Sequence, residues 1–191
     1  MSKRFHLIVT DASPLITLAA ADSLSCLTAP GIPLTIPDMV YFEAVRFPQK
    51  LGASELVDWM QQNAGLVRIE PTQVFAEFQK LLAVDPETKS RGRGEQAALE
   101  VLDQHALRRP GEETLLLFED SDVTRKRFVL PQEAHPITTA DLLDALQAAG
   151  VIPSAAAVLQ NAVARGRSAG VSVRHADADV KRDLASDIEE R

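Results

Sequence analysis

The chain is poor in the residues that mark several classes of protein. It holds a single cysteine, Cys26, which excludes an internal disulfide, a thiolate zinc site and a C-x-x-C redox motif. Aromatic residues make up only 5% of the chain. No apolar run approaches the roughly 20 residues of a membrane span. The apolar run near the N-terminus is interrupted at Asp11, which argues against a signal peptide. We therefore expect a cytoplasmic protein with no membrane association.

The composition is that of a soluble globular protein. Hydrophobic residues account for 46% and charged residues for 25% of the 191 positions. The net charge of −7 argues at first against a nucleic-acid partner. Part of this excess lies in the acidic stretch from His175 onward, whereas basic clusters such as Arg125-Lys126-Arg127 occur in the body of the chain. Charge alone therefore leaves the partner open.

The hydrophobic pattern alternates between strand-like and helical segments. The strand-like segments are 5–10, 34–36, 66–69, 114–118 and 136–138. The helical segments are 14–27, 38–46, 53–63, 72–83, 95–107, 140–149 and 154–165. Strands joined by helical crossovers predict an α/β fold, a three-layer sandwich with a central parallel sheet of about five strands. From about Arg174 large apolar residues are few, so we expect a domain over 1–170 and a charged tail over 171–191, mobile or marginally helical.

Acidic residues follow two of the expected strands. Asp11 ends the first, in "LIVTDASPLITLAA", and Asp120 and Asp122 follow the fourth, in "LLLFEDSDVTRKRF". In an open parallel sheet, ligands bind outside the carboxyl ends of the strands. If the first and fourth strands are neighbours, Asp11 and Asp120 meet at one edge. The alternative is that Asp11 or Ser13 merely caps the following helix.

Further acids lie on the helices beside that edge. Glu43 follows the second strand in "IPDMVYFEAVR", and Glu95 lies in a first helical turn in "RGRGEQAALEVL". Such carboxylates repel one another unless a divalent cation neutralises them, and Mg²⁺ or Mn²⁺ takes oxygen ligands of this kind. The alternatives are a surface salt bridge for Glu43 and a helix-dipole contact for Glu95. Glu119 is expected to face solvent.

Four segments, in this order and spacing, resemble the motifs of the PIN-domain family of metal-dependent nucleases, which includes the toxins of VapBC toxin–antitoxin pairs. They are "DASPLITLA", "IPDMVYFEAVR", "GRGEQAALEVL" and "FEDSDVTRKRF", and the likeness extends over about 5–165. In the last motif an acid is followed by a basic residue five positions on, as Asp120 is by Arg125.

The resemblance implies a Mg²⁺- or Mn²⁺-dependent ribonuclease that acts as the toxin of a toxin–antitoxin pair. Its partners would be RNA, a cognate antitoxin and a second copy of the chain, bound through the helices at 53–63 and 72–83. The resemblance implies Asp11, Glu43, Glu95 and Asp120 as catalytic residues, Asp11, Glu95 and Asp120 as metal ligands, and Ser13 as a supporting hydroxyl. Asp122 is a further candidate metal ligand, and the basic residues beside these acids, Arg125, Lys126 and Arg127, are the candidates for binding RNA.

The sequence departs from the family pattern in two places. Asp122 adds a carboxylate, so the last ligand is either Asp120 or Asp122. After the fifth strand, "ITTADLL" lacks the usual glycine, and Thr138 with Asp141 fits a capping box instead. A catalytically silent PIN-like binding module is the alternative function. A dehalogenase-type phosphatase ranks lower, because it needs an aspartate where Ser13 stands.

Overall fold

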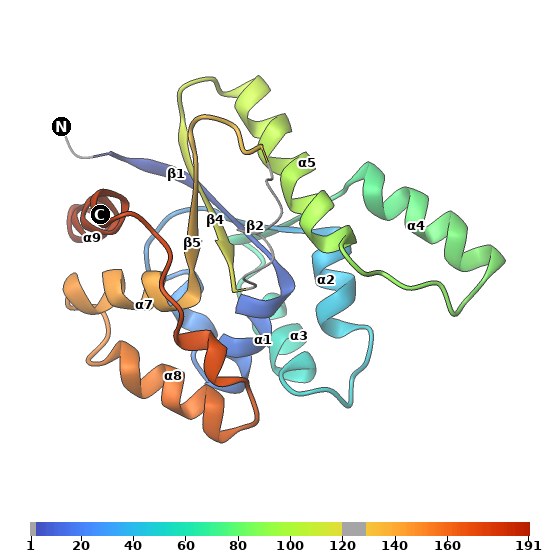
Figure 1. The fold of residues 1–191 in the computed structure, drawn as a ribbon, viewed down its shortest axis with the longest axis horizontal. Helices are drawn as coiled ribbons and strands as arrows, with labels where there is room; N and C mark the ends of the chain where they lie inside the picture. Colours follow the sequence, from blue (N-terminus) through green and yellow to red (C-terminus); the bar gives the residue numbers. More distant parts are fainter. Residues whose placement is uncertain (1–2, 120–128) are drawn as a thin grey trace.

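The protein is built on a single parallel sheet. The computed structural model describes residues 3–119 and 129–191. Its strands are β1 (Phe5–Thr10), β2 (Leu34–Pro37), β3 (Val67–Glu70), β4 (Glu113–Phe118) and β5 (Ala134–Thr138). They are arranged in the order β3-β2-β1-β4-β5, and each paired neighbour runs parallel (Figure 1). The predicted α/β class with five parallel strands is confirmed.

Helices cover both faces of this sheet. They are α1 (Ala12–Ala20), α2 (Asp38–Val45), α3 (Ala53–Gln62), α4 (Gln73–Val84), α5 (Arg93–Arg108), α7 (Thr139–Ala148), α8 (Ala155–Ala164) and α9 (Ala178–Glu189), with short 3-10 turns η1 (Leu24–Leu27) and η2 (Ala169–Ser172). Alternate residues of β1 face opposite layers. Ile8 belongs to the main core with α1, α7 and α9, whereas Leu7 and Val9 pack against α5. No helix in the described ranges is both long enough and apolar enough to span a membrane.

The first helical segment is shorter than the sequence pattern predicts. The expected helix over 14–27 is wrong, because α1 ends at Ala20 and the chain re-forms as the 3-10 turn η1. Between them, Asp22 adopts a left-handed backbone with φ of 55°. An aspartate tolerates this conformation better than most residues, and a regular helix cannot contain it. Apolar residues on both sides of the break are buried, which explains why the hydrophobic pattern continued through it.

The C-terminal segment packs against the body of the protein instead of forming a mobile tail. Val180, Leu184 and Ile188 are spaced four residues apart on α9 and are buried in the same core as Ile8. Few apolar residues suffice, because these three lie on one helical face. Asp187 on the same helix accepts a hydrogen bond from the backbone N–H of Phe5, at 2.8 Å. Of the two expectations for this segment, the helix is the one that the structure has, and it is docked on the body of the protein.

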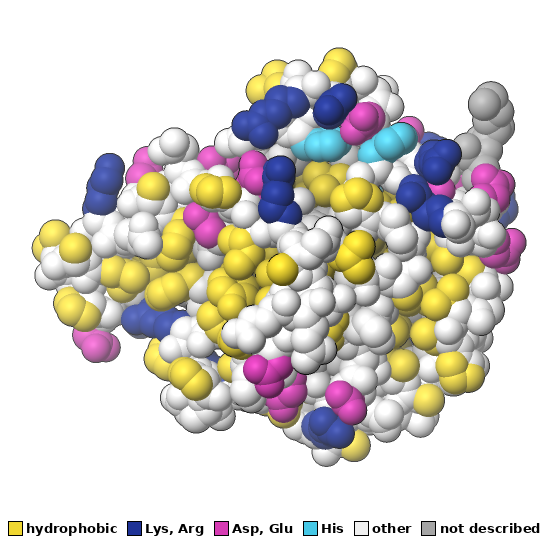
Figure 2. All heavy atoms as spheres, turned by 180° about the vertical axis from the view of Figure 1, so that it is seen from behind, with side chains coloured by type: hydrophobic (Ala, Val, Ile, Leu, Met, Phe, Trp, Pro, Cys, Tyr) yellow, Lys and Arg dark blue, Asp and Glu magenta, His cyan; other side chains and the backbone are white. Residues whose placement is uncertain are grey.

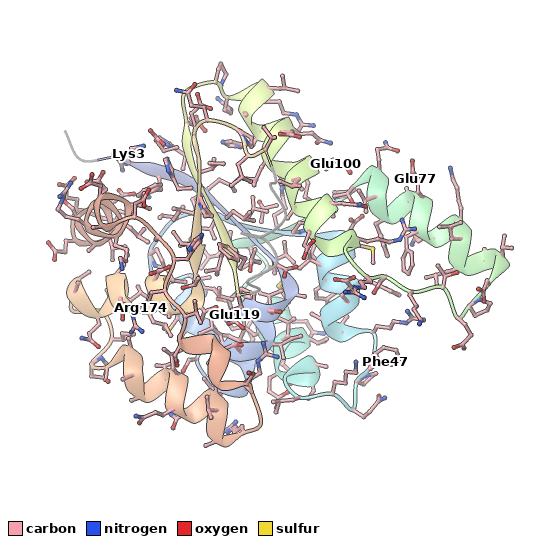
Figure 3. The ribbon with its side chains drawn as sticks, in the orientation of Figure 1. Lys3, Phe47, Glu77, Glu100, Glu119 and Arg174 are labelled. Carbon is pink, nitrogen blue, oxygen red and sulfur yellow. The ribbon has the colours of Figure 1, made fainter. Side chains whose placement is uncertain are left out.

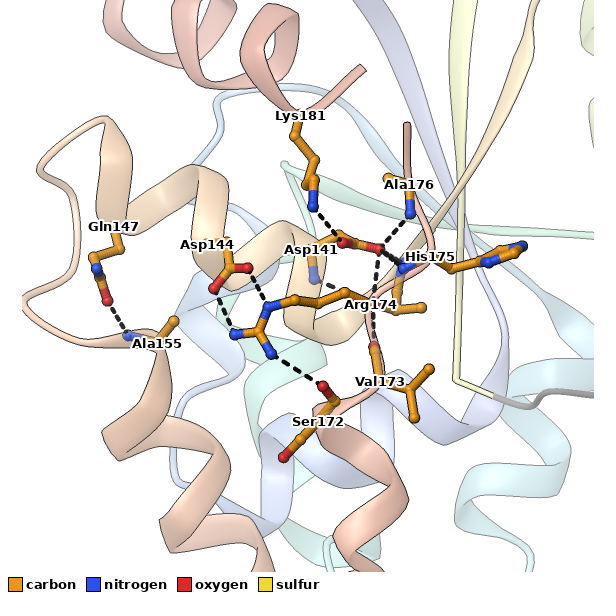
Figure 4. A network of polar contacts seen from close by, with 11 residues as sticks. Asp141, Asp144, Gln147, Ala155, Ser172, Val173, Arg174, His175, Ala176 and Lys181 are labelled. Carbon is orange, nitrogen blue, oxygen red and sulfur yellow. Dashed lines mark hydrogen bonds and ion pairs between the residues drawn. The ribbon is translucent and has the colours of Figure 1, made fainter. Parts of the chain in front are cut away.

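A buried carboxylate, Asp141, anchors the segment that precedes α9. Thr138 and Asp141 form the predicted capping box at the start of α7. Asp141 Oδ2 also accepts the backbone N–H groups of His175 and Ala176, at 2.8 and 2.9 Å (Figure 4). Burial would raise the pKa of Asp141, but these hydrogen bonds and that from Thr138 hold it below its usual value. Asp141 therefore joins the chain leading to α9 to the end of β5, and it belongs to the fold.

Candidate functional site

Asp11 lies at the carboxyl end of the central strand. β1 and β4 are neighbours in the sheet, which is the arrangement needed for the acids after both strands to share one edge. The backbone N–H of Asp11 donates to the carbonyl of Leu117 in β4, at 2.9 Å. Asp11 is the N-cap residue of α1, but its side chain makes no capping hydrogen bond. The Asp11 carboxylate therefore does not act as a helix cap, and capping does not explain why an acid stands at this position.

Gly94 lies where two carboxylates converge. A methyl group on Gly94 would lie 2.5 Å from Glu43 Oε2 and 3.3 Å from Asp11 Oδ1, so the carboxylate of Glu43 would have to move to make room for it. The glycine before Glu95 thus leaves space for the two carboxylates where α2 and α5 approach each other. Since both oxygens lie near one point, they are within about 6 Å of each other. Oxygens that share one cation are up to about 5 Å apart.

Glu43 is half-buried on α2 and interacts electrostatically with Asp11 and Glu95. Burial raises the pKa of Glu43, a hydrogen bond from Ser90 lowers it, and the charges of Asp11 and Glu95 raise it again, so that together they bring it to about 7. These surroundings do not fit a surface salt bridge. Perturbation by burial together with like charges is common at functional sites.

Three of the predicted residues therefore come together from three elements. Asp11 follows β1, Glu43 lies on α2, and Glu95 lies in the first turn of α5. Ser13 lies in the first turn of α1, and its backbone carbonyl accepts a hydrogen bond from Arg167 at 3.4 Å. The other predicted site residues, Asp120, Asp122, Arg125, Lys126 and Arg127, lie outside the described residues.

The donor set fits a hard divalent cation in its chemistry. Asp11, Glu43 and Glu95 offer carboxylate oxygens, which Mg²⁺ and Mn²⁺ prefer. Within 3–119 and 129–191, however, no three His, Cys, Asp or Glu side chains are already arranged around a metal position. Mg²⁺ usually keeps several waters and takes only one or two carboxylates.

Glu119 is buried, and the expectation that it faces solvent is wrong. Its side chain is 6% exposed. It accepts hydrogen bonds from Thr17 Oγ1 at 2.8 Å, Thr139 Oγ1 at 2.5 Å and Arg167 Nη2 at 2.9 Å. Figure 3 shows Glu119 where the end of β4 meets α1. Burial of an acid is tolerated here because the charge is paired and the remaining lone pairs are occupied.

Arg167 connects this acid to the segment that follows Asp11. Its Nε donates to Thr17 Oγ1 at 2.7 Å, so the guanidinium contacts both α1 and Glu119. Ser13, Glu119 and Arg167 line a cavity of about 290 Å³. The sequence gives little sign of this network, because Arg167 lies 150 positions beyond Thr17 and only the fold brings them together.

No family model, characterised protein or solved structure matches the chain in comparisons with known proteins. What the fold defines is a three-layer α/β protein with an acidic site at the carboxyl edge of its sheet. The likeness to PIN-domain nucleases rests on the sequence motifs alone and stays a prediction.

Proposed function

We propose that the protein is a Mg²⁺- or Mn²⁺-dependent ribonuclease of the PIN type and the toxin component of a toxin–antitoxin pair. One observation carries the proposal: Asp11, Glu43 and Glu95 reach the carboxyl edge of a parallel sheet from three different elements, and the charges of Asp11 and Glu95 raise the pKa of Glu43. Accumulating acids at one point costs stability, and such a cost is typical of a site that serves a reaction.

A divalent cation bound there would lower the pKa of water and offset charge on the phosphate during hydrolysis. Asp11 and Glu95 are proposed as its protein ligands on the described side of the site. Glu43, whose pKa is about 7, would exchange a proton near neutral pH. Asp120 and Asp122 are proposed to complete the ligand set. Arg125, Lys126 and Arg127 are proposed to contact phosphates of the RNA.

The proposed partners include a second copy of the chain and an antitoxin. α4 extends away from the rest of the molecule (Figure 1) and exposes Leu81 and Val84, at 44% and 87%. An apolar side of a projecting helix is suited to a symmetric interface between two copies. We propose that α3 and α4 supply this interface and that the protein acts in the cytoplasm.

A catalytically silent PIN-like module that binds RNA is the second candidate. It is favoured by the described acids, since they do not form a complete metal-binding group of three. Both candidates predict that RNA binds near the acidic edge of the sheet. They differ only in whether the bound RNA is cleaved.

Cleavage of RNA by the purified full chain distinguishes them. We expect an end-labelled single-stranded RNA to be cut in the presence of Mn²⁺ and to remain intact with EDTA. Asp11→Asn should lower the single-turnover rate by at least 10²–10³-fold, the order of magnitude for loss of one electrostatic group at a reacting centre. Asp22→Asn is the matched control, because Asp22 is exposed and asparagine accepts its left-handed backbone.

An Asp11→Asn protein that cuts as fast as wild type would refute the nuclease proposal. Binding of RNA by wild type without any Mn²⁺-dependent cleavage would favour the silent module.

A further inference from the structure

A second cavity lies at the opposite edge of the sheet from the acidic site. It has a volume of about 580 Å³ and lies between the last turns of α5 and the start of β1, β2 and β3. α5 connects the two: at 1.5 Å per residue, Glu95 at the acidic site lies about 9 Å along the helix from Val101 and about 20 Å from Arg108, both of which line this cavity. The cavity and the acidic site share no residue.

This cavity forms a groove, and the floor of the groove is aliphatic. It is formed by Leu7, Leu34, Val67 and Val101, all of them buried. Leu66 continues this apolar surface outward at the rim and is 64% exposed. Among the described residues that line the groove, none is Phe, Tyr or Trp. The floor can therefore take aliphatic side chains, but it offers no platform for stacking bases.

The rim of the groove is basic. Arg68 on β3 stands on one side, and Arg108 and Arg109 follow one another at the end of α5 on the other. Figure 2 shows histidine side chains lying among Lys and Arg side chains, with some Asp and Glu side chains beside them, next to a hydrophobic region of this face. The groove is thus locally positive, although the net charge of the whole chain is −7. Local charge of this kind selects partners of opposite charge.

Glu70 is the only acid among the described residues that line the groove. It contacts Arg68 and lies 3.7 Å from Arg108 Nη1. The side chains of Arg68 and Arg108 are 66% and 65% exposed, while Glu70 is 15% exposed. Each guanidinium has five N–H donors, and one shared carboxylate cannot occupy them all. Both arginines therefore lie near Glu70 and keep N–H donors directed to solvent.

We propose that this groove is a docking site for an acidic segment of a partner protein that also carries aliphatic side chains. Carboxylates of the segment would pair with Arg68 and Arg108, since arginine matches a carboxylate in bidentate geometry. Leucine, isoleucine or valine side chains would cover the aliphatic floor. A nucleic acid fits less well, because the floor of the groove is aliphatic and the described lining has no aromatic side chain on which a base could stack. The inference is independent of the nuclease proposal.

Selection from a displayed library of random dodecapeptides tests this docking site. Full-length wild-type protein is the bait, and an Arg68→Glu/Arg108→Glu double variant removes peptides that bind elsewhere. Both positions are largely exposed, so we expect the variant to fold, which circular dichroism would verify. The enriched peptides are expected to combine Asp or Glu with Leu, Ile or Val. Failure of enrichment, or enrichment without an excess of acids, would overturn the proposal.

An enriched peptide is then measured by fluorescence polarisation. Arg108→Glu is expected to weaken its binding at least about tenfold, since charge reversal leaves a carboxylate facing a carboxylate. Arg182→Glu is the matched control, because Arg182 is similarly exposed, at 71%, but lies on α9. Equal affinities for wild type and Arg108→Glu would overturn the proposal. Tighter binding of an octameric oligouridylate that displaces the peptide would also overturn it, in favour of a nucleic-acid site.

Discussion

Replacing Glu43 by glutamine should make the metal-free protein more stable at alkaline pH. In the folded protein, burial and the charges of Asp11 and Glu95 raise the pKa of Glu43 from 4.5 to about 7. A raised pKa means that the folded state binds the proton more tightly than the unfolded state does. The protonated form therefore contributes its full stabilisation of the folded state below about pH 4.5, and this contribution is lost as the pH rises through about 7.

The size of this effect follows from the shift. One pKa unit corresponds to about 1.4 kcal/mol, so complete ionisation of Glu43 would lower the free energy of unfolding by about 3 kcal/mol. Between about pH 5.5 and 8.5 the loss attributable to this group is roughly 2 kcal/mol. Glutamine keeps the shape of the side chain and can still accept a hydrogen bond from Ser90, but it carries no charge. Glu43→Gln should therefore lack this part of the pH dependence.

Urea unfolding followed by circular dichroism, in EDTA at several pH values, measures the effect. Glu77→Gln is the control, because Glu77 is an exposed glutamate on α4, away from the acidic site (Figure 3). Addition of Mg²⁺ should raise the stability of wild type at alkaline pH more than that of Glu43→Gln, since a cation offsets the same charge. Identical pH profiles for wild type and Glu43→Gln would refute the account of the site's electrostatics.

Other predictions concern the buried carboxylates Glu119, Asp141 and Asp187, which stabilise the fold through ion pairs and hydrogen bonds. Arg167→Ala leaves Glu119 as an uncompensated buried acid and should lower the free energy of unfolding by about 3–5 kcal/mol, measured by urea unfolding at neutral pH; a loss near zero would contradict the role of the pair. Asp141→Asn should flatten the acid side of the stability profile, because the lowered pKa of Asp141 gives stability that is lost as the pH falls; an unchanged thermal melt at low pH would contradict this. Asp187→Ala removes the acceptor for Phe5 N–H and should cost about 1–3 kcal/mol, with faster amide hydrogen exchange at Phe5 as the specific sign.

The sequence predicts the layout of the fold well because the sheet is parallel. Parallel strands read as apolar runs, and the crossover rule then places their carboxyl ends at one edge. That reasoning brought Asp11 to the same place as Glu43 and Glu95, which lie on helices that begin near that edge. The sequence pattern also marked the glycine before Glu95, and in the structure Gly94 lies next to the carboxylate of Glu43.

What the sequence does not predict depends on long-range contacts. α9 has a low overall hydrophobicity, and its few buried side chains become significant only once the body of the protein covers them. Glu119 follows a strand like any exposed acid, and its burial depends on Arg167, which comes from the distant segment after α8. The early end of α1 depends on the conformation of Asp22, since the hydrophobic pattern runs on through it.

Binding of Mn²⁺ to the purified chain tests the central claim, that the acids at the carboxyl edge of the sheet form a cation site. Isothermal titration calorimetry would compare wild type, Asp11→Asn and the exposed control Asp22→Asn under one buffer condition. We predict a saturable Mn²⁺ site in wild type and in Asp22→Asn, with affinity reduced at least about tenfold in Asp11→Asn. Equal Mn²⁺ affinity in wild type and Asp11→Asn would contradict the account.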